Sequence, residues 1–309
     1  MSAFVPVAVA SRSDVDESVH HGAVVGLDHR GDVVLAVGDP DIEIYPRSCA
    51  KPLQAAAMLA AGLVLPDELV ALVAASHDGT PTHVAGVRAI LETVGCSERD
   101  LANTPTWPLD PIAAEAAIRA HDLPCSIFQN CSGKHAGMIA TARANGWGVE
   151  GYLHPDHPVQ RLIIEYLDRA TGGVSHVGID GCGAPTPVCR LRGLAEAVRR
   201  LAIEGHPVTR AMIEHPEMVG GASRDVTALM RAVPGLVAKD GAEGVYVAAL
   251  ADGRAAALKI ADGAGRARLP VMVAALRALG VDVPVDSLVE PVLGHGRPVG
   301  SVRSVIGTP

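Results

Sequence analysis

The order of β-prone and helix-prone segments constrains the fold of this chain most strongly. β-prone apolar runs lie near both ends, within about residues 1–45 and 235–309, and residues of about 49–230 between them favour helix. Strands from both ends of a chain bury their apolar faces by joining one layer that helices cover. We therefore expect an α/β (α+β) fold with a mixed, mainly antiparallel sheet, flanked by helices, and an adjoining helical region.

Single segments can be assigned in more detail. "AVVGL" (23–27) and "VVLAV" (33–37) are separated by "DHRGD", which predicts a β-hairpin with Gly31 in its turn. Residues 49–61 favour a helix that ends at Gly62 and accepts Pro52 in its first turn. Further helices are expected at 66–75, 83–94, 110–120, from Ser132 onward, and at 156–170, 187–204, 206–219 and 267–279. Further strands are expected within "SHVGIDGCGAPTP" and at 235–238, 244–250, 255–260 and 299–306.

The composition limits the expected partners. An apolar fraction of 49% with 19% charged residues indicates a globular chain. Aromatic residues make up only 3%, which leaves few stacking platforms for single-stranded nucleic acid, and the net charge of −8 argues against a broad phosphate-binding face. No uncharged apolar run reaches the ~18–20 residues that a transmembrane helix needs. A small molecule is the expected partner, with no nucleic acid and no membrane.

The N-terminal segment and the cysteines indicate the compartment. "MSAFVPVAVASRSD" has no basic region, and Pro6 interrupts its short apolar run, so we expect a first strand and not a signal peptide. Six cysteines in 309 residues without a secretion signal are best explained as reduced thiols. The sequence thus predicts a cytoplasmic protein.

"RSCAKP", residues 47–52, is the first stretch with chemical content. Ser48 precedes Lys51 by three residues at a predicted helix start, so both side chains can lie on one side. A serine becomes nucleophilic when a neighbour takes its proton, which a lysine of lowered pKa can do and an arginine cannot. Four lysines against 22 arginines make a default surface lysine less expected here. The alternative is a helix cap beside a surface lysine, because Ser-x-x-Lys is a short pattern that recurs by chance.

A second serine and a second lysine lie in comparable settings. Ser76 follows an apolar predicted helix and precedes "HDG", and Lys259 lies in "AAALKIADG", a predicted strand with few charges. Such a lysine either extends its ammonium to solvent or is a partly desolvated functional group. The sequence alone does not show that Ser76 and Lys259 meet in space.

Cysteines and a lysine in "NCSGKHAGM" and "GIDGCGAPTP" are candidate metal ligands. Cys131 could pair with His135 on one helix face, or with Lys134, although lysine is an uncommon ligand. Cys182 lies between two glycines, where a thiolate is easily presented. The alternative is buried, inert thiols. Asp180 could orient a ligand or bind a substrate amino group, or it is an ordinary turn residue.

Together these stretches resemble the thermolabile, Rhizobium-type L-asparaginases, the asparaginase II family. "RSCAKP", "NCSGKHAGM" and "GIDGCGAPTP" carry the resemblance in this order, whereas "SHDGTPTHV" matches less fully because Thr80 stands where an acidic residue is common. The resemblance implies a single domain over 1–309 with a fold similar to serine β-lactamases, penicillin-binding proteins and glutaminases. It also implies a homodimer.

The resemblance also implies the activity and the residues behind it. L-asparagine and water would give L-aspartate and ammonia through an acyl-enzyme. The implied catalytic residues form two pairs, Ser48 with Lys51 and Ser76 with Lys259. One zinc ion per subunit is implied near the active site, held by residues matching Cys131, Lys134 and Cys182. Arg47 and Asp180 are the candidates for binding the substrate α-carboxylate and α-amino group.

Two other classes of function remain open. The first is another Ser–Lys hydrolase: a glutaminase, a β-lactamase or a peptidase. The second is a non-catalytic zinc-binding protein on the same scaffold. The presence of both serines and both lysines argues against the second, because a lapsed enzyme has no reason to keep all four.

Overall fold

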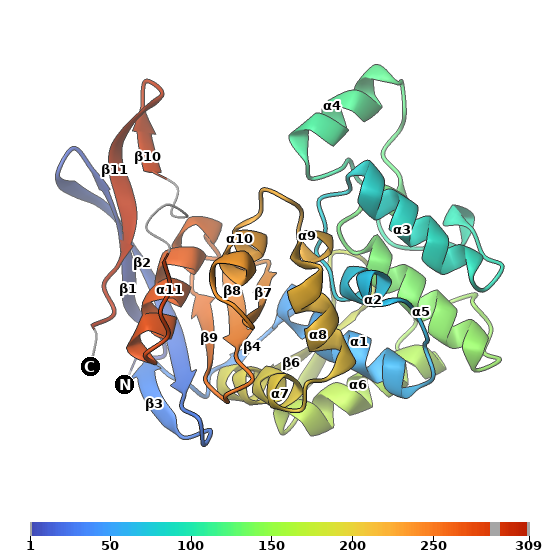
Figure 1. Ribbon diagram of the computed structural model, residues 1–309, viewed down its shortest axis with the longest axis horizontal. Coiled ribbons are helices and arrows are strands. Elements are labelled where there is room, and N and C mark those ends of the chain that lie inside the picture. The colour runs from blue at the N-terminus through green and yellow to red at the C-terminus, as the bar shows by residue number, and fades with distance from the viewer. Residues whose placement is uncertain (1, 285–290, 308–309) are drawn as a thin grey trace.

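Strands from the two ends of the chain form one antiparallel sheet in the computed structural model, which describes residues 2–284 and 291–307 (Figure 1). The sheet has eight strands in the order β10-β11-β1-β2-β9-β8-β7, with β3 also paired to β2. Every pairing in it is antiparallel. The strands are β1 (Val5–Arg12), β2 (Val15–Leu27), β3 (Val33–Val37), β7 (Val237–Gly241), β8 (Val245–Ala249), β9 (Ala255–Ile260), β10 (Pro291–Gly294) and β11 (Arg297–Ser304). The predicted fold class is confirmed.

The central part of the sheet explains why the two termini lie side by side. β1 pairs with β11, so the first and last described strands are neighbours (Figure 1). The predicted hairpin is confirmed, with Val24 opposite Val37 and with Gly31 at a left-handed φ of 93°. β2 begins earlier than the "AVVGL" run, because Ser13 and Asp14 adopt positive φ angles of 46° and 66° and turn β1 directly into it.

Helices cover the sheet and form the adjoining region (Figure 1). α7 and α11 both pack against β8 and β9. The helices are α1 (Lys51–Ala60), α2 (Asp67–Val73), α3 (Pro81–Glu92), α4 (Pro111–Arg119), α5 (Ser132–Ala144), α6 (Pro158–Thr171), α7 (Leu191–Ile203), α8 (Pro207–Glu214), α9 (Pro216–Val219), α10 (Asp225–Ala232) and α11 (Arg268–Ala278). Short 3-10 helices are η1 (Arg47–Ala50), η2 (Glu98–Asp100), η3 (Ser126–Phe128) and η4 (Gly265–Ala267).

Three expectations from the sequence differ from the structure. The helix expected over 187–204 is wrong at its start, because Pro185–Arg190 form β6, and α7 begins at Leu191. The helix expected over 206–219 divides at His215, as the residue before a proline disfavours the helical conformation. α10 and β10 were not expected. Ser132 does not cap α5, because its hydroxyl donates to the Ile127 carbonyl at 2.8 Å.

A second, small sheet lies within the helix-rich region. β6 pairs with β4 (Glu43–Ile44) on one side and with β5 (His176–Ile179) on the other, both antiparallel. The sequence predicts a strand in the β5 segment but not this small sheet. β4 precedes η1, and the turn after β5 contains Asp180. This small sheet therefore brings the "RSCAKP" and "GIDGCGAPTP" stretches to one place.

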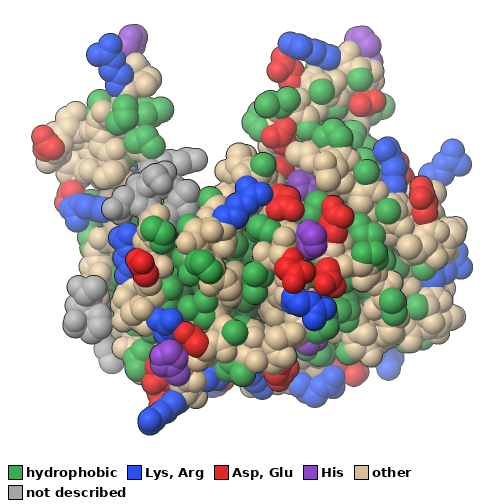
Figure 2. Space-filling model, in the orientation of Figure 1, with side chains coloured by type: hydrophobic (Ala, Val, Ile, Leu, Met, Phe, Trp, Pro, Cys, Tyr) green, Lys and Arg blue, Asp and Glu red, His purple; other side chains and the backbone are tan. Residues whose placement is uncertain are grey.

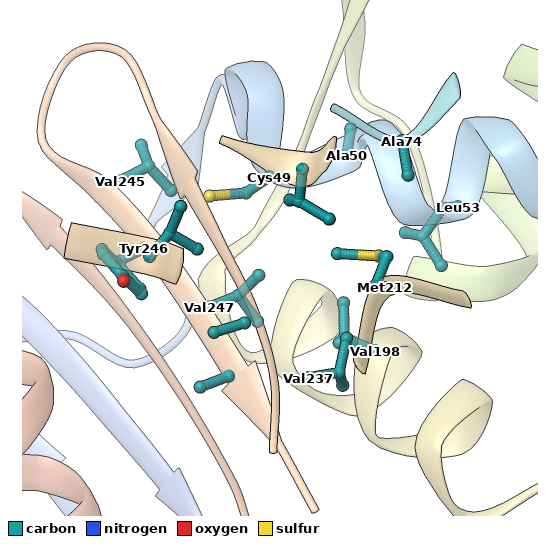
Figure 3. Close-up of a cluster of buried hydrophobic side chains, with 14 of the residues drawn as sticks. Cys49, Ala50, Leu53, Ala74, Val198, Met212, Val237, Val245, Tyr246 and Val247 are labelled. Carbon is teal, nitrogen blue, oxygen red and sulfur yellow. The ribbon is translucent and has the colours of Figure 1, made fainter. Parts of the chain in front are cut away.

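The core fixes the start of α1 against the main sheet. Cys49, Ala50 and Leu53 face the buried side chains of β7 and β8, including Val237 and Val247 (Figure 3). These residues are 2% exposed or less, and burying an aliphatic side chain of this size stabilises a fold by roughly 1.5–3 kcal/mol. The backbone of η1 is therefore held rigidly beside the β7–β8 hairpin.

Two parts of the molecule project from the same side. One is the end of the β10–β11 hairpin and the other is α4 (Figures 1 and 2). The α4 segment carries large apolar side chains that are mainly exposed, Ile112 at 78% and Ile118 at 55% among them.

Candidate active site

A pocket of about 260 Å³ opens where the helical region meets edge strand β7. Its wall combines η1, the segment before α5, the turn after β5 and the β7–β8 turn. The volume lies below the roughly 300–1,000 Å³ of pockets for drug-sized ligands, so it suits a small polar molecule. The lining residues are Arg47, Ser48, Thr106, Leu109, Gln129, Asn130, Cys131, Asp180, Gly181, Cys182 and Ala242.

Arg47 and Ser48 enter this pocket from η1. Arg47 has a φ of 50°, a left-handed conformation that is uncommon for a residue with a side chain and that often marks a functional site. Its Nε donates to Asp180 Oδ1 at 2.8 Å. Among residues 2–284 and 291–307, the Ser48 hydroxyl has no hydrogen-bond partner, so it is open to a ligand in the pocket.

Asp180 is the acidic partner of Arg47 in the pocket wall. One of its oxygens also accepts the Gly181 N–H at 2.8 Å. Burial acts to raise the pKa of Asp180, but the positive charges of Lys134 and Arg47 outweigh it and leave the pKa below its usual value. The two predicted substrate-binding residues are therefore brought together as a charged pair beside Ser48.

Lys51 begins α1, three residues after the pocket residue Ser48, and is only 1% exposed. Its ammonium nitrogen donates to the Ala75 carbonyl at 2.5 Å and to Ser76 Oγ at 3.0 Å. Burial lowers the pKa of Lys51, while the neighbouring Cys131 thiol acts in the opposite direction. The lysine thus directly contacts one of the two predicted catalytic serines.

The structure pairs Ser76 with Lys51 and not with Lys259. α1 directs Lys51 under the loop that carries Ser76, whereas Lys259, on β9, donates to the carbonyls of Glu243 and Ile260. Glu243 links Lys259 to the pocket, because its carboxylate also lies 3.8 Å from the guanidinium of Arg47. Burial lowers the pKa of Lys259, and Glu243 partly opposes this shift.

The three predicted zinc ligands converge at the edge of the pocket. Lys134 Nζ lies 3.3 Å from Cys182 Sγ, and the Cys131 and Cys182 thiols share a hydrogen bond. All three residues are buried, with exposures of 6% or less. The Cys131 sulfur also lies 3.2 Å from Asn130 Oδ1. Two cysteine sulfurs are ligands that zinc prefers, and a deprotonated Lys134 amine would be a third, less common donor, so these residues fit such an ion.

The pKa values of Cys131, Cys182 and Lys134 are shifted by their mutual contacts, and a metal ion would have to displace the protons that these residues carry. The hydrogen bond from Cys182 holds the pKa of Cys131 well below its usual range, and the same bond raises the pKa of Cys182. Burial acts to lower the pKa of Lys134, but the neighbouring thiols raise it above its usual value. A metal ion at these donors would replace protons as it binds.

His135, the alternative ligand considered from spacing, faces elsewhere. Its Nδ1 forms a 2.8 Å hydrogen bond with the Tyr152 hydroxyl, and that hydroxyl accepts the Ala102 N–H at 3.0 Å. Of the residues that the structure describes, no three from His, Cys, Asp and Glu form a metal-binding group. Any metal bound here would depend on Lys134.

A model of the family described as L-asparaginase II matches residues 8–304. The chain belongs to the L-asparaginase II family. This confirms the resemblance carried by "RSCAKP" and the other three stretches, and membership supports an amidohydrolase activity. No curated protein matches the chain.

Several solved structures also match this chain, at low sequence identity. Mglu in its glutamate form is 15% identical with a TM-score of 0.48, and the match covers 84% of this chain but only 60% of Mglu. A putative β-lactamase from Bacteroides dorei is 14% identical, with coverages of 84% and 92% and a TM-score of 0.46. Simvastatin synthase LovD from Aspergillus terreus is 11% identical, with coverages of 78% and 86% and a TM-score of 0.38.

This L-asparaginase II family member also contains a buried charge network that the sequence analysis missed. Lys239, on β7 and fully buried, donates to the Asp240 carboxylate at 2.5 Å. Arg224 bridges Asp240 at 2.6 Å and Asp78 at 3.0 Å, and Arg268 lies 3.5 Å from Asp240. Because Asp78 follows Ser76 by two residues, the network ties the Ser76 loop to the sheet. A lysine–aspartate pair directly after the predicted strand at 235–238 was the available signal.

Within the described ranges 2–284 and 291–307, no helix of this family member is long and apolar enough to cross a bilayer.

Proposed function

We propose that this chain hydrolyses the side-chain amide of L-asparagine to L-aspartate and ammonia. The observation that carries the proposal is the unpaired Ser48 hydroxyl in a small pocket beside the Arg47–Asp180 ion pair. Family membership supports the same activity. An amino acid with charges of both signs suits a pocket whose wall presents both a guanidinium and a carboxylate.

Ser48 is the proposed nucleophile, with Lys51 as its general base. The Ser48 oxygen bonds to the amide carbon as its proton passes to the neutral Lys51 amine. For this transfer the Ser48 hydroxyl and the Lys51 amine approach each other within the turn that both residues occupy. Backbone N–H groups at the start of η1 stabilise the oxyanion. The carbon–nitrogen bond then breaks, the proton passes to the leaving nitrogen, and ammonia departs. Water next cleaves the ester, its proton returning to Ser48.

Ser76 is proposed to relay protons to and from Lys51. Its hydroxyl is 3.0 Å from the lysine nitrogen and can pass a proton to the leaving group. Lys259 is proposed to act through the Glu243 turn, where it adds positive charge near Arg47. These assignments keep all four residues in the catalytic set while Ser76 acts with Lys51.

Cys131, Lys134 and Cys182 are proposed to hold one zinc ion per subunit. A bound zinc would supply a Lewis acid that orients a polar group of the substrate, since Ser48 and Lys51 already provide a nucleophile and its base. The proposal is supported by Cys131 and Cys182, which both line the pocket proposed to bind the substrate. Zinc content is measured on the purified protein by mass spectrometry, and fewer than about half an equivalent after zinc supplementation contradicts the assignment.

Ammonia release from L-asparagine tests the proposed activity. Ser48→Ala should abolish turnover and keep the melting temperature within about 2 °C, because the Ser48 side chain forms no hydrogen bond within the described part of the chain. Near-normal ammonia release from this variant would exclude Ser48 as nucleophile. Parallel assays with L-glutamine and a chromogenic β-lactam separate an asparaginase from a glutaminase or a β-lactamase, and a protein that binds zinc but turns over no substrate is non-catalytic.

A homodimer is proposed as the assembly. The support is the α4 segment, where Ile112 and Ile118 expose apolar area that a partner copy would cover. Light scattering measures the mass of the particle, and Ile112→Glu with Ile118→Glu should shift a dimer toward monomer. A wild-type monomer at micromolar concentration contradicts this proposal.

The cytoplasm is proposed as the compartment. All six cysteines are free thiols, and most are buried. Free thiols in this number are typical of a reducing compartment. Fractionation of the native cells tests the assignment, and recovery of the protein outside the cytoplasm contradicts it.

A further inference from the structure

Gln129 lines the pocket without having been singled out by any motif. It lies at the end of η3, two residues before Cys131, and lines the same pocket as Ser48. Only 7% of the residue is exposed. A buried amide of this kind must direct either its oxygen or its nitrogen into the pocket, and the two ends recognise opposite chemistry.

Asn103 decides which end of Gln129 faces the pocket. The Asn103 Nδ2 group donates to the Ser126 carbonyl at 2.7 Å. A carbonyl only accepts, so this end of Asn103 must be the nitrogen. The same nitrogen lies 2.8 Å from the Gln129 side chain, which must therefore offer its oxygen, Oε1, as the acceptor. Asn103 is 1% exposed, so water does not compete for these bonds.

The orientation leaves the Gln129 amide nitrogen as a free donor. Within the described part of the chain, Nε2 has no protein partner. Asn103 Oδ1 is both unpaired and inaccessible to solvent. Gln129 Nε2 is unpaired but does not belong to this inaccessible group. This nitrogen therefore reaches the open space of the pocket with two N–H groups in a fixed direction.

We propose that Gln129 donates a hydrogen bond to an oxygen atom of the bound substrate and so determines specificity. This rests on the proposed function, in which the substrate offers two such acceptors, the α-carboxylate and the side-chain amide carbonyl. The fixed donor selects ligands that place an oxygen at this position. It also rejects ligands that place an N–H group there, because two donors facing each other both lose their partner.

Gln129→Glu isolates the atom that faces the pocket. The glutamate has the same shape and keeps an oxygen for Asn103 Nδ2, so the hydrogen bond that orients the side chain remains. Only the pocket-facing donor is replaced, by a charged acceptor. We expect kcat/KM for L-asparagine to fall about 100-fold, and about 10-fold for Gln129→Met, which removes the donor without adding a charge. Stability should change less in the glutamate variant than in the methionine variant.

A matched control is available in Gln160, a buried glutamine of α6. Its Nε2 donates to the Tyr152 carbonyl at 2.8 Å, so its donor is already used inside the protein. Gln160→Glu should lower the melting temperature, because it removes a donor that the fold uses. Gln129→Glu should instead lower kcat/KM. Zinc content is measured in every variant, because Gln129 lies close to Cys131.

The kinetic constants distinguish the two acceptors. A rise in KM with unchanged kcat, together with weaker inhibition by L-aspartate, assigns the bond to the α-carboxylate, whereas a fall in kcat at unchanged KM assigns it to the amide carbonyl. The inference is overturned if Gln129→Glu keeps kcat/KM within about threefold of wild type. It is also overturned if activity is lost only together with zinc or with melting temperature. If the wild-type protein itself releases no ammonia and binds no L-aspartate, the proposed function fails first and this inference falls with it.

Discussion

Removing the charge of Asp240 tests the buried network most directly. Asp240 is 2% exposed and its carboxylate lies 2.5 Å from Lys239 Nζ and 2.6 Å from Arg224 Nη2. Burial acts to raise the pKa of Asp240, but Lys239 and Arg224 outweigh it and hold the pKa well below its usual value. The carboxylate is therefore ionised at neutral pH, and Asp240→Asn leaves the fully buried Lys239 cation without its counter-charge.

The expected loss is large on the scale of a whole protein. Breaking a buried ion pair by removing one partner costs about 3–5 kcal/mol, against a total stability of roughly 5–15 kcal/mol. For a chain of this length we expect the melting temperature to fall by roughly 6–10 °C, at about 2 °C per kcal/mol. Urea denaturation at pH 7 gives the free energy of unfolding, and an unchanged m-value verifies that the same transition is compared.

Two further variants and one pH series complete this test. Asp252→Asn removes a carboxylate that pairs with Arg254 at 2.7 Å but is 39% exposed, so it should cost about 1 kcal/mol or less. Adding Lys239→Met to Asp240→Asn should recover part of the stability, because the unpaired cation is removed. The folded-state pKa is depressed, so Asp240 stabilises fully above its unfolded pKa and loses this contribution as pH falls through the folded value. The stability difference should thus be constant from about pH 5 to 8 and narrow only in strong acid. A loss below about 1 kcal/mol at pH 7 would refute the reasoning.

The other predictions concern the pocket. Ser76→Ala should lower kcat by about 100-fold with little change in KM in steady-state assays, because Lys51 loses its relay, and an unchanged kcat contradicts that role. Lys134→Met should reduce the zinc content of the purified protein to well below one equivalent, and full occupancy removes the lysine from the ligand set. Arg47→Lys should raise KM for L-asparagine roughly 10-fold, because an ammonium cannot hold Asp180 and a carboxylate together as the planar guanidinium does, and equal KM values count against this binding mode.

Local patterns were sufficient for much of the main sheet. The β-prone runs "AVVGL" and "VVLAV" on either side of Gly31 predict a hairpin that the structure confirms, because a short turn between two such runs pairs the strands next to it. The position of strand-forming runs at both chain ends was enough to predict a sheet built from the termini. The stretch Pro185–Arg190 misled the same reasoning, because a short apolar run with prolines is assigned to strand or helix only when its neighbours are known.

The sequence alone is enough to identify chemically unusual residues: a rare lysine three positions after a serine, and a cysteine between two glycines in a tight turn. Only the tertiary structure decided which of them meet. It placed Ser76 beside Lys51 and not Lys259, joined Asp78 to Asp240 through Arg224, and used Asn103 to turn the Gln129 amide toward the pocket. These contacts join residues 16 to 146 positions apart. A hydrogen bond depends on distances of a few ångströms that packing of the whole chain sets, and no local pattern encodes them.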